Sequence, residues 1–562
     1  PPLSLPSALP VAPLLFMAKP LLSLPGLAPL GIIVSQKLFP APPVPVKSTV
    51  DSALVSTIAD STRIARTSDS GVISPLDRSR SQADSEKSRL AEAKPETLSV
   101  VTPKAIYHFT PLGAAPLDVV LNDYHVMPKA SNKNVTLGRA HAPLLSYALL
   151  RGRDTLRLDQ IEFKVDATAI SANPGIAFST DVHGAHVTIT YGFSSDGYLA
   201  NVHGSIKGLD STTVLLIHLH QGLPFVEADS ADDLHSLAYV AKPLHEDAHS
   251  VPFTKLDSLA PTVERDSLAW VASKNKYFLV ALIATPPGKP FEAAVFTRGP
   301  HEQKAVSSAD ALILQPLTQN GEFAFDVYSG PQEWRRLHQM GRNLEHVNPY
   351  GSFLRPVVQP FATIVMQVVL WIHDRLKINY GWVLIIFGIT IRLLLWPLNQ
   401  GAMRNSLKLQ RIQPQLQEIQ KKYKSNPEKL QSEMSKLYRE HGMSPFTPLA
   451  GCLPMLIPMP VLFALYFVFQ NTIEFRGVSF LWLPDLSQRD PFFILPALMG
   501  ISMYVLSWIS LRSAPPNPQA KTMAYIFPVL MDVLFLRHAA GTNLQQATPN
   551  IAHLPHQWNS AA

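Results

Sequence analysis

The sequence predicts a polytopic α-helical membrane protein that carries a separate all-β domain. Three observations support this fold class. Only 16% of the 562 residues are charged, against ~25% in an average soluble domain. Several apolar stretches after residue 379 approach the length of a bilayer-spanning helix. Between 100 and 335, by contrast, apolar and polar residues alternate with a period of two, which is typical of strands.

The first 98 residues divide into two segments. Residues 1–39 are apolar enough to predict an N-terminal membrane anchor, but twelve prolines fall within 1–45. Each proline inside a helix costs about 3 kcal/mol, so a regular helix is disfavoured there. Residues 40–98 are rich in Pro, Ser, Asp and Arg without apolar periodicity, which predicts a flexible linker.

Residues 99–345 are predicted to form the β domain. Apolar residues alternate along 187–193, a Ser-Ser-Asp-Gly turn follows at 194–197, and the alternation resumes at 198–202. This pattern indicates a β-hairpin. Similar runs occur at 161–165, 214–219, 277–283 and 323–328. Their close spacing leaves no room for crossover helices, so we expect an antiparallel sandwich. Helix is expected again at 334–344.

Two helices are expected next. Residues 346–378 mix apolar residues with Arg, Gln, His and Asp, which favours an amphipathic helix along a membrane surface. Residues 379–398 form the first clear transmembrane stretch; its 19 residues from Tyr380 to Leu398 span roughly 28 Å, about one bilayer core. It contains one charge, Arg392.

The remaining segment, 449–562, is expected to hold the other transmembrane helices. Apolar stretches lie at 449–469, 492–511 and 523–536. The final stretch, 539–558, carries so many polar residues and prolines that hydropathy alone does not predict a span.

Residues 399–448 are polar and basic, with nine Lys/Arg against four Glu. The positive-inside rule therefore places them in the cytoplasm and the β domain on the opposite side. Helical spacing interrupted at 425–427 predicts a helical hairpin. Its basic residues either dock anionic lipid, a ribosome or a nascent chain, or only fix topology. They are Arg404, Lys408, Arg411, Lys421, Lys422, Lys424, Lys429, Lys436 and Arg439.

Arg392 and a histidine pair are the candidate site residues outside that segment. Arg392 starts roughly 9 Å inside the cytoplasmic face, so its guanidinium either snorkels to the surface or faces a hydrated cavity and attracts acidic groups; we favour the cavity. His218 and His220 have a spacing that two metal ligands can use. No third ligand is evident in the sequence, so ordinary sheet histidines are favoured and no metal site is predicted.

Several longer strings resemble the YidC/Oxa1/Alb3 family of membrane insertases. They include ITIRLLLWPLN ending at Asn399, the basic segment from 409 to 445, LAGCLPMLIPMPVLFALY at 449–466 and LWLPDLSQRDPFF beginning at Leu481. WVASKNKYFLVALI at 270–283 resembles the periplasmic domain of the Gram-negative branch of that family.

This resemblance implies an insertase and chaperone of the inner membrane rather than an enzyme. It implies a five-helix core, an N-terminal anchor, a periplasmic β-super-sandwich and a cytoplasmic hairpin. Arg392 matches an arginine in a hydrophilic substrate groove. The implied partners are nascent membrane proteins, the Sec translocon (SecYEG, SecDF), the ribosome and lipids. No cofactor and no specific nucleic-acid ligand are implied.

Two other classes of protein compete with this interpretation. The first is an anchored periplasmic carbohydrate-binding or mutarotase-like protein, which needs convergent His and carboxylate groups within 100–335; the sequence alone shows no such site. The second is a transporter, which predicts internal repeats with broken helices. No such repeat is found.

Overall fold

The computed structural model describes residues 97–561 except for short gaps. The gaps are 128–131, 140–141, 167–174, 195–196, 210–211, 258–259, 300–305, 349, 351–354, 425, 442–458, 513–517 and 537. The predicted anchor at 1–39 and the linker up to residue 96 therefore lie outside the described residues.

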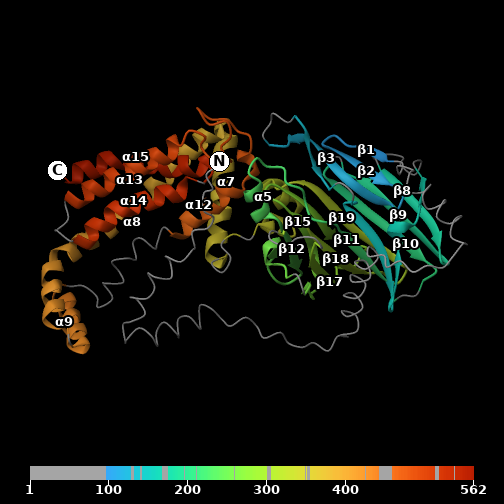
Figure 1. Ribbon diagram of the computed structural model, residues 1–562, viewed down its shortest axis with the longest axis horizontal. Helices are drawn as coiled ribbons and strands as arrows, with labels where there is room; N and C mark the ends of the chain where they lie inside the picture. Colours follow the sequence, from blue (N-terminus) through green and yellow to red (C-terminus); the bar gives the residue numbers. More distant parts are fainter. Residues whose placement is uncertain are drawn as a thin grey trace, which may run out of the picture. The chain divides into compact units, whose positions relative to one another are not determined.

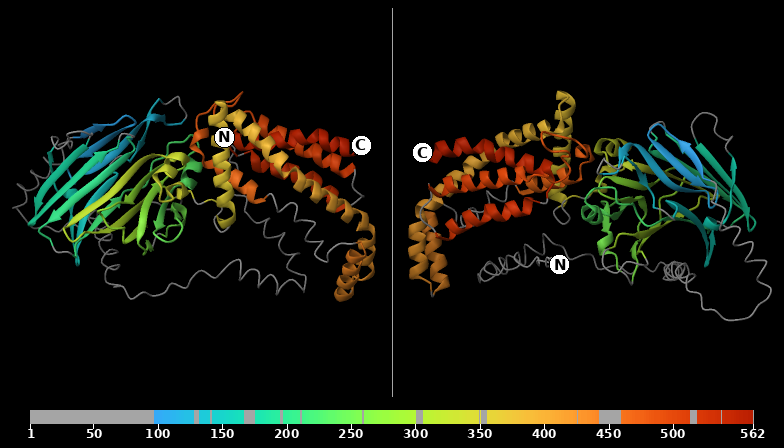
Figure 2. Two further views of the ribbon diagram at one scale, coloured as in Figure 1. Left: turned by 180° about the vertical axis from the view of Figure 1, so that it is seen from behind. Right: turned by 45° about the horizontal axis from the view of Figure 1, so that its top comes forward.

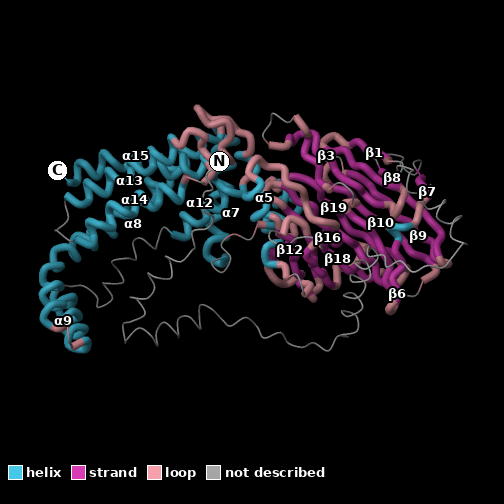
Figure 3. Tube along the Cα trace, in the orientation of Figure 1, coloured by secondary structure: helices cyan, strands magenta, loops and turns pink. Residues whose placement is uncertain are grey.

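The β domain consists of antiparallel sheets packed face to face (Figure 3). The first sheet, in spatial order, contains β1 (Leu98–Val101), β2 (Ala105–Thr110), β3 (Ala115–His125) and β4 (Asn134–Leu137). The nine-stranded sheet contains β13 (His249–Pro252), β12 (Ala238–Pro243), β15 (Leu268–Lys274), β16 (Phe278–Ala284), β19 (Glu322–Pro331), β10 (Leu199–Lys207), β9 (Ala185–Phe193), β8 (Gly175–Val182) and β7 (Lys164–Asp166). The six-stranded sheet contains β14 (Thr262–Glu264), β17 (Ala293–Arg298), β18 (Ala309–Pro316), β11 (Val214–Leu219), β5 (Leu145–Arg151) and β6 (Asp154–Arg157).

The predicted hairpin and sandwich are confirmed. β9 and β10 pair antiparallel with Phe193 opposite Ala200. The alternate residues of β9 point into one shared core because successive side chains of a strand face opposite sides. The expected strand at 161–165 is displaced: a short 3₁₀ helix, η2 (Leu158–Gln160), precedes it, and the strand runs from Lys164 to Asp166.

Other short helices lie within the β domain or directly after its last strand. These are α5 (Ser230–Ser236), η3 (Phe253–Lys255), α6 (Trp334–Met340) and η4 (Leu344–Val347). The helix expected at 334–344 ends early, because Gly341 adopts a φ of 73° that terminates α6.

The longer helices form a second layered region (Figure 1). They are α7 (Arg355–Leu376), α8 (Tyr380–Lys422), α9 (Pro427–Glu440), α12 (Met459–Asn471), α13 (Ile494–Arg512), α14 (Pro518–Phe535) and α15 (Ala540–Ala561); a short 3₁₀ helix, η6 (Ile473–Phe475), follows α12. α15 packs against α8 and α13, α14 against α13, and α12 against α7. In Figure 2, α7 crosses the common direction of α8, α13, α14 and α15.

Two helices in the described part of the chain are long and apolar enough to cross a membrane, by length and composition. They are Arg355–Leu376 and the Tyr380–Pro397 portion of α8. Shorter apolar stretches lie at Ile494–Ile509 and Ala524–Val533.

Two helices add detail to the sequence expectation. α8 continues without interruption from Tyr380 to Lys422 through Pro397 and Pro414, so the apolar stretch and the start of the basic segment share one helix. α15 is a helix of 22 residues, and its polar composition leaves it outside the candidate spans of the described residues. Asn543 is buried there and its side-chain amide donates to Phe535 O at 3.1 Å, while its Oδ1 has no hydrogen-bond partner among the described residues.

Candidate functional site

Arg392 lies on α8 at the edge of the face that packs against the neighbouring helices. The helix begins behind Asn379, whose Oδ1 accepts a hydrogen bond from Gly381 N at 2.8 Å. Arg392 is one turn beyond the buried Gly388 and adjoins Ile391, which packs on the helical core. At 1.5 Å per residue, Arg392 begins about 18 Å from the start of the helix.

The surroundings of Arg392 are apolar and offer it no opposite charge. Within the described residues, no carboxylate lies at ion-pair distance from its guanidinium. The next two side chains, Leu393 and Leu394, are 67% and 70% exposed. A partly buried cation beside an exposed apolar surface is unusual for a protein in water, and it fits a helix whose outer face contacts lipid.

α15 supplies polar residues at the depth of Arg392. The two helices touch near their starts, where a Cβ added to Gly541 would lie 3.3 Å from Leu384 Cδ1. Both helices run in the same direction from that point (Figure 1). Arg392 follows Leu384 by eight residues on α8, and Thr548 and Asn550 follow Gly541 by seven and nine residues on α15. Asn550 is partly exposed.

The segment between α12 and α13, residues 472–493, closes one end of the helical region; we call it the cap segment. Phe475, Phe480 and Leu486 within it are buried. Its backbone carbonyls also satisfy the start of α15: Ala540 N donates to Gln488 O at 2.6 Å and Gly541 N to Leu486 O at 2.8 Å. The buried N-terminus of α15 is thereby capped.

The cap segment also connects the helices to the β domain through a buried ion pair. Arg476 Nε donates to Glu227 Oε1 at 2.7 Å, and its terminal nitrogen donates to His125 O at 2.8 Å. Both charged side chains are at most 7% exposed. A second connection comes from the first residue of α7, since Arg355 donates to Ala248 O at 2.7 Å.

The basic residues after the transmembrane stretch lie on two packed helices. α9 packs against the end of α8 through Ile412, Leu416, Leu437 and Tyr438. The side chains of the six later basic residues are exposed; they are Lys421, Lys422, Lys424, Lys429, Lys436 and Arg439. Arg404, Lys408 and Arg411 belong to α8, but their side chains lie outside the described part.

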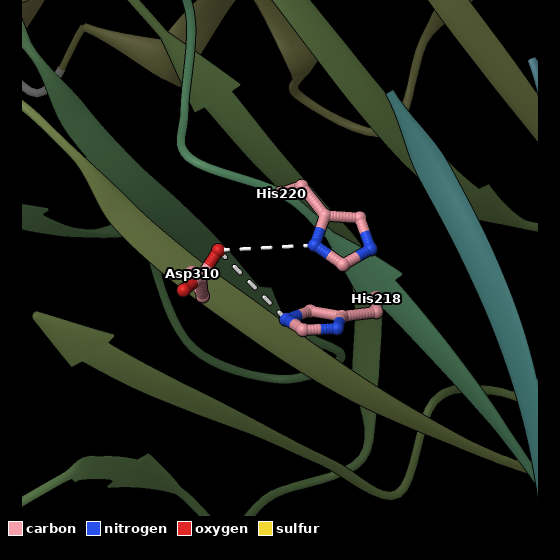
Figure 4. Close-up of side chains that lie close together, drawn as sticks. All are labelled: His218, His220 and Asp310. Atoms are coloured by element: carbon pink, nitrogen blue, oxygen red, sulfur yellow. Dashed lines mark ion pairs between the residues drawn. The ribbon is translucent and has the colours of Figure 1, made fainter. Parts of the chain in front are cut away.

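The histidine pair has a third neighbour that sequence reasoning missed. His218, His220 and Asp310 converge on one face of the six-stranded sheet (Figure 4). Asp310 Oδ1 lies 3.9 Å from His218 Nε2 and 4.0 Å from His220 Nδ1. The strand register explains the convergence: β11 and β18 pair with His218 opposite Leu312 and Leu219 opposite Ala311, so His220 comes opposite Asp310.

Both imidazoles of this cluster are held neutral. Burial lowers the pKa of His218 to about 4. Burial, followed by the neighbouring His218, lowers the pKa of His220 to about 3. A neutral imidazole has a free lone pair, which is the form that binds metal or accepts a proton. The convergent His and carboxylate group that the sequence did not reveal is therefore present in the β domain.

The fold thus defines a class: a protein with apolar, membrane-type helices and an all-β sandwich domain. Known families agree with this division. The family model described as "YidC periplasmic domain" matches residues 97–364, and the model described as "60Kd inner membrane protein" matches residues 371–561. The chain belongs to the YidC family.

Curated relatives carry the same family name. "Membrane protein insertase YidC" of Chlorobaculum parvum is 31% identical over 409 residues, which cover 68% of this chain and 67% of the relative. The protein of that name from Chlorobium limicola is 30% identical over 395 residues, 66% of this chain and 65% of the relative. The matches thus span about two thirds of the length of each.

Two solved structures are among those that match parts of the chain, both with low TM-scores. A structure described as an active YidC insertase with its first transmembrane domain resolved covers 82% of this chain and 92% of its own, with 20% identity and a TM-score of 0.33. A galactose mutarotase-like protein from Lactobacillus casei covers 42% of this chain and 100% of its own, with 10% identity and a TM-score of 0.31.

Proposed function

We propose that this chain is an insertase that moves hydrophobic segments of nascent proteins into a membrane, with Arg392 as the positive charge of a polar groove beside α8 and α15. Two observations support the proposal: family models match residues 97–364 and 371–561, and Arg392 lies within the apolar part of α8. Arg392 is a partly buried cation on a helix of bilayer length and has no carboxylate partner among the described residues.

The physical task of such a groove is to lower the cost of bringing polar groups to membrane depth. An unsatisfied backbone group in hydrocarbon costs several kcal/mol. Arg392, with Thr548 and Asn550 at the same depth, offers charge and hydrogen bonds to the polar or acidic flank of an incoming segment. The apolar part then leaves across the exposed leucines of α8 into lipid, where its own partitioning supplies the driving force. No nucleotide hydrolysis enters this scheme.

The cap segment gives the groove a closed end. Its buried aromatic residues and the hydrogen bonds to the start of α15 fill the space where α8 and α15 begin. α7 crosses the other helices (Figure 2), which favours an interfacial position along the membrane surface on this side. The groove would accordingly open toward lipid and toward the far ends of α8 and α15.

The charge distribution gives the orientation. The basic residues of the helix pair formed by α9 and the end of α8 favour a cytoplasmic position for this pair. The β domain would then be periplasmic, and the membrane the inner membrane. The five-helix core would consist of the first part of α8 with α12, α13, α14 and α15. Nascent membrane proteins are the expected substrates; the Sec translocon, the ribosome and anionic lipid are the proposed partners.

The direct test compares Arg392→Ala, Arg392→Lys and Arg375→Ala in proteoliposomes. The substrate is a single-span protein whose translocated flank is either acidic or neutral. For the acidic flank we expect Arg392→Ala to lower the insertion rate about tenfold, which corresponds to about 1.4 kcal/mol, and Arg392→Lys to retain most of it. Arg375 is an exposed arginine at the end of α7 and serves as the matched control. Equal insertion by Arg392→Ala and Arg375→Ala would refute the role of Arg392.

The helix pair is tested by deleting residues 409–441 and measuring substrate capture by crosslinking. We expect capture from ribosomes to fall while the truncated chain still integrates into the membrane. Unchanged capture would show that the basic residues only set the orientation of the chain in the membrane.

The mutarotase-like alternative is not favoured. The curated relatives are named as insertases, and the 371–561 match lies outside the region that a sugar-processing fold would explain.

A further inference from the structure

We propose that His218, His220 and Asp310 form a binding site for a divalent transition-metal ion, with Zn²⁺ as the best-matched ion, on the six-stranded sheet of the β domain. This site is independent of Arg392 and of membrane insertion. Its candidate ligand atoms all lie within 4.8 Å of one another, and Figure 4 shows the two rings and the carboxylate turned toward a common point.

The spacing of the donors is close to that of a bound ion. Zinc–nitrogen and zinc–oxygen bonds of about 2.0–2.2 Å place neighbouring ligand atoms of a tetrahedral site about 3.3 Å apart. The two measured separations from Asp310 Oδ1 are 3.9 and 4.0 Å. Contractions of about 0.6 and 0.7 Å bring these two separations to that value, and the nitrogen atoms of the two histidines, which lie within 4.8 Å of each other, would have to approach as well; rotation about the side-chain bonds is the movement we propose for this.

The backbone of β11 and β18 positions all three residues. His218 belongs to β11 and Asp310 to β18, which are hydrogen-bonded neighbours. His220 follows β11 by one residue, and its backbone N–H donates to Leu144 O at 3.4 Å. Preorganised donors on rigid strands lower the entropy that ion binding would otherwise have to overcome.

Hydrogen bonds around the cluster orient the ligands. Ser146 Oγ lies 2.7 Å from His220 Nε2, so the opposite ring nitrogen, Nδ1, faces Asp310. Gln221 N donates to Asp310 Oδ1 at 2.9 Å and holds the carboxylate in place. Metal-binding histidines and carboxylates are commonly fixed by outer partners of this kind.

The types of ligand atom determine which ion the cluster would bind best. Two imidazole nitrogens and one carboxylate oxygen suit zinc and similar transition metals rather than Ca²⁺ or Mg²⁺, which prefer oxygen ligands. The side chains are 31%, 19% and 27% exposed for His218, His220 and Asp310 respectively. The cluster is therefore accessible from solvent and leaves a fourth position for water.

The test is a titration of the tag-free full chain, stripped with EDTA and held in detergent, with ZnCl₂ in competition with a chromogenic zinc indicator. We expect one tight site. His220→Ala and Asp310→Asn should each weaken binding by more than about 100-fold, because even loss of an outer partner costs 10–100-fold. Asp310→Asn can retain the hydrogen bond from Gln221 and so preserves the local fold. Ser146→Ala, which removes only a positioning group, should give a smaller loss, within about 10–100-fold.

The matched control is His186→Ala. His186 forms a pair with Asp181 at 2.7 Å in the same domain, and among the described residues this pair belongs to no group of three candidate ligands. Its loss should leave zinc affinity unchanged. Cobalt gives an independent readout, since Co²⁺ bound by nitrogen ligands has a characteristic visible spectrum that the Asp310→Asn chain should lack. Wild-type affinity no tighter than that of His220→Ala, or equal losses in His220→Ala and His186→Ala, would overturn the proposal.

Discussion

The junction between the β domain and the cap segment differs from α8 in how buried charge is accommodated. Arg476 of the cap segment and Glu227 of the β domain are almost fully buried and are joined by a 2.7 Å hydrogen-bonded ion pair. Lys276, which is 7% exposed, contacts the more exposed Asp232 at 2.7 Å. On α8, Arg392 is partly buried and has no carboxylate partner among the described residues. Removing one partner of a buried pair is strongly destabilising, whereas an ionisable residue at membrane depth suggests a functional role.

The largest expected effect comes from breaking the paired charge. Arg476→Ala leaves Glu227 buried without its partner, which typically costs about 3–5 kcal/mol. We expect a loss of that size in the free energy of unfolding, measured by chemical denaturation in detergent. Arg157→Ala is the control, because Arg157 and its partner Asp159 are 48% and 24% exposed and are therefore far less buried than Arg476 and Glu227. Similar losses in the two variants would contradict the contrast between buried and exposed pairs.

Glu474 in the cap segment should make stability depend on pH. Burial, reinforced by the nearby Glu333, raises its pKa from 4.5 to about 7. The folded chain therefore keeps this proton up to about pH 7, while the unfolded chain releases it near pH 4.5. Stability should fall as pH rises through that window, by at most about 3 kcal/mol.

Glu474→Gln tests this sign. The variant should lack that part of the pH dependence and be more stable than the wild type above pH 7, in unfolding measured at a series of pH values. A wild type and variant with parallel pH curves would show that the carboxyl is ionised in both states.

Packing between the cap segment and α8 should produce an intermediate effect. A Cβ on Gly381 would lie 2.1 Å from the ring of Phe480, so the ring or the helix must move. We expect Gly381→Ala to destabilise the chain by about 1–3 kcal/mol, as overpacking does. Gly192→Ala is the control, because a Cβ there meets no atom within 4 Å; a thermal melt of both variants distinguishes the outcomes.

The smallest effect on stability should come from Arg392 itself. Arg392→Ala removes no ion pair to a described residue, so the free energy of unfolding should change by less than about 0.5 kcal/mol. Unchanged stability together with reduced insertion would show that Arg392 acts in substrate binding and does not stabilise the fold. A loss comparable with that of Arg476→Ala would instead assign Arg392 a structural role and weaken the comparison between the two regions.

Local patterns predicted much of the fold. The alternation at 187–193 is sufficient to place a strand and its hairpin partner, since the period of two depends on neighbouring residues alone. Residues 380–398 similarly reveal an apolar helix with one arginine. Local patterns did not indicate that the apolar stretch and the basic segment form one helix, α8, which contains Pro397 and Pro414; packing of α9 on Ile412 and Leu416 supports its far end.

The sequence by itself determined the division into β and helical regions, the family resemblance and the position of Arg392, because each depends on composition, periodicity or a contiguous string of residues. Only the tertiary structure decided which distant residues meet. Asp310 joins His218 and His220 across ninety residues of sequence through the β11–β18 register, and Arg476 reaches Glu227 from a segment 249 residues away. Such meetings arise from strand pairing and packing, which leave no signal in local sequence.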